Sequence, residues 1–214
     1  MCLFMFILIP AILVYECLRA ENKLVLLLSL CGMVTGILVS ACTAVFTYLH
    51  RVPDYGFGSN FVYYLLSFYA LPVILLYAAY FFCTKDSREI RIKAFFPLTA
   101  SFYMIFMPYM IIAADNSLCS FFMLFVKPVL LVSMLFICSR LCHNINDGVL
   151  NQQVPKIVVN SVLSILAFSV PAALETMWVL NFLEIVVFAV SFVIALFALV
   201  LFFIESRHGT KYFF

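Results

Sequence analysis

The chain has 214 residues, of which 67% are hydrophobic and only 10% are charged, and its formal net charge is +2. Ordinary soluble domains are about half apolar and a quarter charged, so this composition predicts a protein embedded in a lipid bilayer. The basic residues form no continuous face that could hold a duplex, which excludes nucleic-acid binding.

Long apolar runs predict transmembrane helices rather than the short alternating strands of a barrel. Seven runs have a suitable length: residues 2–18, 24–48, 61–83, 94–114, 118–141, 157–174 and 182–204. The first lacks a basic amino-terminal segment and a small-residue cleavage pattern, so we expect it to stay in the mature protein. The sequence therefore predicts an all-α, polytopic transmembrane helical bundle of about seven spans that forms a single domain over residues 1–214.

Lysine and arginine positions predict the orientation, because short cytoplasmic loops carry an excess of these residues. If the spans number seven, one face carries Arg19, Lys23, Lys85, Arg88, Arg91, Lys93, Arg140, Lys156, Arg207 and Lys211. Only Arg51 lies on the other face. We therefore expect a multi-pass protein of the cell membrane, with its N-terminus outside, its C-terminus cytoplasmic and residues 142–156 in a cytoplasmic loop.

Lys127 is the one basic residue that falls inside a predicted span. It lies about 14 Å from the outer end of its helix, and a charge at that depth costs on the order of 2.5 to 3.5 kcal/mol. We expect it to pair with Glu175 or Glu184 beneath a cavity that opens to the outer face. The alternative is a buried ion pair, or a lysine that extends to the interface, which only fixes helix register.

The two last spans carry stripes of polar and small residues, which let transmembrane helices approach closely. The sixth span has Asn160, Ser164, Ala167, Pro171 and Glu175 at helical spacing, and the seventh has Glu184, Ser191, Ala195 and Ala198. Both glutamates are therefore expected to face inward. Six prolines also fall within predicted spans, at Pro10, Pro72, Pro97, Pro108, Pro128 and Pro171. Such prolines kink helices and favour an interior cavity.

Acidic and aromatic residues gather at the predicted outer face. Asp115 lies there, together with a group of tyrosines and one tryptophan that fit an interfacial aromatic belt. Tyr63 shares a helix face with Ser67, four residues later, which adds a possible role in ligand stacking. The expected ligand-binding residues are thus Lys127, Glu175, Glu184, Asp115, Tyr63 and Ser67.

A second small-residue pattern occupies the span 24–48. Gly32, Gly36, Ser40 and Ala44 recur every four residues, which predicts a ridge for close helix packing. The partner is another helix of the same chain or, alternatively, a second copy in a homodimer through Gly32, Gly36 and Ser40.

Signatures of catalysis and metal binding are absent from the sequence. It has no H-E-x-x-H, no G-x-S-x-G and no phosphate-binding glycine loop. Cys138, Cys142 and His143 match none of the strong zinc patterns, so neither a metal nor a cofactor is expected. The first hypothesis is a membrane binding or transport component for a small-molecule or ion ligand, working alone or with partner subunits. The alternatives are a receptor-like sensor with a cytoplasmic partner and an intramembrane enzyme.

Overall fold

The computed structural model describes residues 15, 23–50, 56–84, 88–113 and 121–207, and every regular element within them is helical. The chain forms two compact units. Unit 1 comprises Met1–His50, Pro72–Pro128 and Thr210–Phe214, and unit 2 comprises Arg51–Leu71 and Val129–Gly209. The predicted all-α fold is confirmed for the described residues, whereas the single domain stays a prediction.

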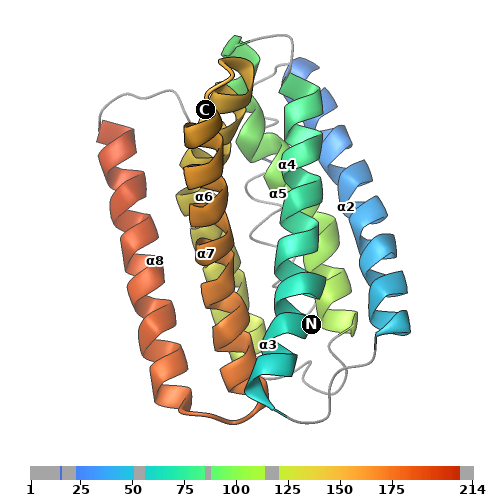
Figure 1. Ribbon diagram of the computed structural model, residues 1–214, viewed down its shortest axis with the longest axis vertical. Helices are drawn as coiled ribbons and strands as arrows, with labels where there is room; N and C mark the ends of the chain where they lie inside the picture. The colour runs from blue at the N-terminus through green and yellow to red at the C-terminus, as the bar shows by residue number, and fades with distance from the viewer. Residues whose placement is uncertain (1–14, 16–22, 51–55, 85–87, 114–120, 208–214) are drawn as a thin grey trace. The chain divides into compact units, whose positions relative to one another are not determined.

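In unit 1, two long helices pack side by side, α2 (Lys23–Leu49) and α5 (Arg88–Ala113) (Figure 1). The unit also contains α4 (Leu71–Thr84) from its second residue onward. A short π-helical turn, η2 (Phe122–Val126), leads into Lys127, where α6 begins. The chain passes into unit 2 one residue after Pro128.

The glycines of α2 allow its close approach to α5. A Cβ atom added at Gly32 would collide with the carbonyl oxygen of Leu98, and one added at Gly36 would lie 2.9 Å from the carbonyl oxygen of Phe102. Both glycines therefore serve packing within unit 1, which is the first of the two predicted alternatives. A homodimer through the same ridge stays a prediction.

The buried line along α2 follows a different spacing from the predicted ridge. Ser40 is half-buried and Ala44 is exposed, while Val39 and Thr43 are buried together with the glycines. Each residue advances an α-helix by about 100°, so positions spaced by four drift by about 40° at each step. Alternating steps of four and three stay on one side, which is why the contact line includes Val39 and Thr43.

Unit 2 contains the helix α3 (Phe57–Tyr64), which continues into the π-helical turn η1 (Leu65–Ala70). It also contains α6 (Lys127–Leu150) from Val129 onward, α7 (Val154–Val179) and α8 (Glu184–Arg207). Helix α7 packs against α3, η1 and α8. Gly56, with φ of 99°, precedes α3 in a left-handed conformation that favours glycine.

Two tight turns join the last three helices. The amide of Gln153 donates to the carbonyl of Gly148 at 2.8 Å, and the amide of Phe182 donates to that of Met177 at the same distance. Gln152 and Asn181 occupy the left-handed position that such helix endings require, with φ of 54° and 55°. Because the connections are so short, successive helices run antiparallel, as Figure 1 shows.

Five helices among the described residues are long and apolar enough to cross a bilayer: Leu26–Leu49, Phe57–Thr84, Lys127–Leu150, Val154–Val179 and Glu184–Leu201. Each overlaps one of the predicted spans. The predicted span 94–114 coincides with α5, whose apolar stretch Phe95–Met110 is shorter. The predicted span 2–18 lies outside the described residues except for Tyr15.

The segment 142–156, predicted as a loop, is mostly helical. Helix α6 continues to Leu150, and only residues 151–153 separate it from α7. Cys138, Cys142 and Asn146 are buried at intervals of four residues, so the helix keeps an inward-facing line beyond Arg140. The polar residues between these positions hide this continuation from a search for apolar runs.

Large apolar side chains are exposed along the outer faces of α7 and α8. On α8, Ile185 is 85% exposed, Phe192 65% and Phe203 55%. Soluble monomers rarely expose continuous apolar faces of this extent. The surface therefore agrees with the apolar helix lengths in indicating a membrane protein.

Candidate functional site

Glu175 is a buried carboxylate on α7, with an exposed fraction of 1%. It lies four residues before the end of the helix at Val179, about 6 Å along the axis. Asn160, Ser164 and Pro171 of the same predicted stripe are also buried, and Ala167 is half-buried. The inward orientation predicted for this face of α7 is confirmed.

Tyr69 of η1 donates a hydrogen bond to Oε2 of Glu175 at 2.6 Å. Tyr64, at the end of α3, lies within electrostatic range of the same carboxylate. We call these three residues the Glu175 site. The short distance is within the range of O–H···O hydrogen bonds, so this contact links η1 to α7.

Further aromatic rings lie beside Tyr64 and close to Glu175 along α7. The ring of Tyr64 stacks on Phe68 with centroids 6.1 Å apart. Trp178, less than one turn after Glu175, meets Phe188 of α8 edge to face at 5.8 Å. Apolar surroundings lower the local dielectric constant, which strengthens polar contacts and makes any unpaired polar group costly.

Three other predicted site residues have different positions. Lys127 is 2% exposed and belongs to unit 1, whereas both glutamates belong to unit 2, so the predicted ion pair stays a prediction. Glu184 is exposed, and the prediction that it faces inward is wrong. It occupies the first turn of α8, and Val187 is the first buried residue of that helix. Asp115 lies outside the described residues.

Tyr63 and Ser67 are buried, with exposed fractions of 9% and 0%. Their spacing of four residues places them on one side of the helix, as predicted. Tyr69 follows Ser67 by two residues, which is about half a turn. The side that reaches Glu175 is therefore a different side of this helix from the one predicted to bind a ligand.

The hydroxyl of Ser67 has no hydrogen-bond partner within the described part of the chain. Buried hydroxyls in regular α-helix commonly donate to the carbonyl four residues earlier, as Thr84 and Ser191 do at 2.7 and 2.6 Å. Ser29 and Thr43, on the face of α2 that meets α5, also lack a described partner. Ser67 differs from these two because it lies in a π-helical turn.

Tyr69 was not among the predicted site residues. The sequence signal for it is its depth, because it lies within the predicted span 61–83, about two turns from the nearer end. A tyrosine at such depth cannot place its hydroxyl at the headgroups and needs an acceptor inside the protein. Glu175, the one glutamate in the predicted inward stripe of the sixth span, was the available acceptor.

The site offers a carboxylate, phenolic hydroxyls and aromatic rings, which suit a small cation rather than a metal-assisted reaction. Among the described residues, no three His, Cys, Asp or Glu side chains lie close enough to hold a metal ion. Comparisons with protein-family models, with curated proteins and with solved structures found no match to this chain.

Proposed function

We propose that this protein is an integral membrane binding or transport component for a small organic cation, which binds at the Glu175 site. The supporting observation is the Glu175 carboxylate, which is buried in a membrane helix and bound by a tyrosine from another helix. Ionisable groups in transmembrane segments are rare and commonly mark ligand or ion pathways. Tyrosine faces beside a carboxylate add cation–π attraction for an ammonium group.

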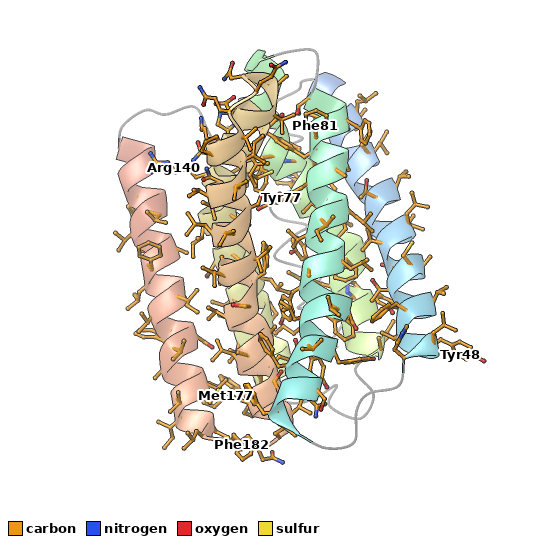
Figure 2. All side chains as sticks on the ribbon, viewed as in Figure 1. Tyr48, Tyr77, Phe81, Arg140, Met177 and Phe182 are labelled. Carbon is orange, nitrogen blue, oxygen red and sulfur yellow. The ribbon has the colours of Figure 1, made fainter. Side chains whose placement is uncertain are left out.

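The distribution of charge in unit 2 supports entry from the end where α7 meets α8. Arg140 lies toward one end of the unit, while Met177 and Phe182 lie at the opposite end, near Glu175 (Figure 2). Lys156 lies in the first turn of α7 at the basic end, and Glu184 begins α8 at the other. The positive-inside bias places the basic end in the cytoplasm, so a cation reaches Glu175 from outside. In this proposal the chain has seven spans, with its N-terminus outside.

Uptake into reconstituted vesicles tests the proposal. We expect purified protein in liposomes with an inside-negative potential to accumulate radiolabelled tetramethylammonium several-fold above protein-free liposomes. Glu175→Gln removes the charge and keeps the shape, so accumulation should fall to the protein-free level. Glu184→Gln makes the same change at an exposed carboxylate and should retain most of the activity.

Each possible result has a clear interpretation. Equal accumulation by Glu175→Gln and the unmodified protein would refute the role of the carboxylate. Binding of the probe to the protein without accumulation would favour the receptor-like sensor, which uses the same site without moving its ligand. If the probe neither binds to the protein nor accumulates in the vesicles, small quaternary ammonium ions are excluded as the ligand class.

A further inference from the structure

Two π-helical turns, η1 and η2, each end directly before a residue that is followed by proline. The amide of Leu71, directly before Pro72, donates to the carbonyl five residues earlier, and the amide of Lys127, directly before Pro128, does the same. In an α-helix the ring of a proline collides with the carbonyl four residues earlier, and proline has no amide hydrogen to donate. A wider turn before the proline accommodates both effects.

Proline alone does not produce such a turn in this protein. Pro97 and Pro108 lie inside the continuous α-helix α5, and Pro171 lies inside α7. At η1 the additional feature is Tyr69, which lies within the turn and binds Glu175. π-Helical turns inside α-helices are frequent at functional sites, and here the turn carries the residue that completes the site.

The π register relates the positions of the two tyrosines of the Glu175 site. Tyr64 and Tyr69 are five residues apart, and a π-helical turn brings residues with that spacing to the same side. In an α-helix the same two positions would point about 140° apart, since each residue advances the helix by about 100°. The π register therefore places both tyrosines on one side of the helix.

Within η1, Ser67 has a buried hydroxyl with no partner in the described part of the chain. In an α-helical register, the carbonyl of Tyr63 would lie one turn earlier, where serine hydroxyls commonly donate. The π-helical state has the contact between Tyr69 and Glu175, and an α-helical state would offer the Ser67 hydroxyl the carbonyl of Tyr63 as an acceptor. Two arrangements with compensating polar contacts are the condition for a two-state element.

We propose that η1 is a two-state switch that closes and opens the Glu175 site. In the closed state the turn is π-helical and Tyr69 donates to Glu175. In the open state the turn is α-helical, Ser67 donates to the carbonyl of Tyr63, and the Glu175 carboxylate is free of Tyr69 to receive a ligand. The identity of that ligand rests on the proposed function, whereas the two registers are a property of the chain alone.

Distances within unit 2 measure the register without any ligand. Spin labels attached through unnatural amino acids at Val62 of α3 and Val170 of α7 report the rotation of α3 against α7 by pulsed electron paramagnetic resonance. Tyr69→Phe and Glu175→Gln each remove the contact of the closed state and should produce the same second distance population. Pro72→Ala should produce it as well, because it removes one of the two features that favour the wide turn.

Ser67→Ala provides the sharpest test of the mechanism. Alone it should leave the distance unchanged, because the hydroxyl has no partner in the closed state. Combined with Tyr69→Phe it should reduce the second population at least several-fold, since the open state then lacks its own hydrogen bond. Pro108→Ala, in an α-helix without a π turn, and Tyr109→Phe are the controls and should show the single distance of the unmodified protein.

The outcomes separate the switch from the proposed function. A single unchanged distance in all the η1 variants, each eluting as a folded monodisperse protein, would overturn the switch. The second population in the two control variants would also overturn it, because the effect would then be unspecific. If the predicted populations appear but tetramethylammonium neither shifts them nor accumulates in vesicles, the switch stands and the proposed ligand class fails.

Discussion

At the scale of single residues, the stability of unit 2 depends on the polar contact that Tyr69 makes with Glu175. Tyr69→Phe keeps the ring and deletes the donor to a buried carboxylate, so we expect a loss of about 1 to 3 kcal/mol in the free energy of unfolding. Unfolding of the purified protein in detergent measures this loss. Tyr109→Phe, at a half-buried ring with no hydrogen bond described, should change stability by less than about 0.5 kcal/mol. Similar losses in the two variants would contradict the assignment.

Gly32 is the residue on which the packing of α2 against α5 depends most closely. Gly32→Ala places a methyl group against the Leu98 carbonyl oxygen, and the backbone cannot yield without separating the two helices. We expect a loss of about 1 to 3 kcal/mol, measured by unfolding in detergent. Gly58→Ala is the matched control, because a Cβ atom there meets nothing within 4 Å. Gly58→Ala should leave the free energy of unfolding unchanged or raise it by up to about 1 kcal/mol. Equal destabilisation by Gly32→Ala and Gly58→Ala would refute the close contact of Gly32 with Leu98.

At the scale of elements, the sequence predicts helices better than it predicts their ends and contact lines. The apolar runs locate α2, α7 and α8 because their lipid-facing residues are apolar along the whole length. The continuation of α6 to Leu150 was missed because its inward line, Cys138 to Asn146, is interrupted by polar residues. The contact of η1 with Glu175 was missed because the two residues that make it lie more than one hundred positions apart in sequence, which local spacing does not contain.

The turn between α7 and α8 contains a conformational strain that can be measured. Leu183 has φ of 44° and is 68% exposed, so its backbone is strained and its side chain packs little. Leu183→Gly should therefore stabilise the protein by up to about 1 kcal/mol. Leu196→Gly makes the same change within α8, where glycine costs about 1 kcal/mol, and should destabilise it. Thermal unfolding of the two variants should shift in opposite directions, and shifts of the same sign would refute the strain.

At the scale of the whole molecule, composition and hydropathy predict the environment of the chain, and the exposed apolar faces of α7 and α8 support it. The position of the site is less accessible to such reasoning. Glu175 was found from its helical stripe, whereas Glu184 was misassigned because a stripe does not show where neighbouring helices stop covering it. Among the described residues, Glu184 lies in the first turn of α8 directly after the tight turn, and burial on this helix begins only at Val187.

The orientation of α7 in the membrane can be tested at the two turns that flank it. If α7 crosses the bilayer, the two turns at its ends lie on opposite sides, with the α6–α7 turn in the cytoplasm according to the positive-inside bias. Gln153→Cys and Phe182→Cys place a thiol at exposed positions of the two turns. In intact cells, a membrane-impermeant maleimide should label Phe182→Cys above the background of the unmodified chain and should label Gln153→Cys only after the membrane is permeabilised. Labelling of both variants in intact cells would show that α7 does not cross the membrane. Labelling of Gln153→Cys alone in intact cells would place the Glu175 site near the cytoplasm, so that its ligand would enter from inside.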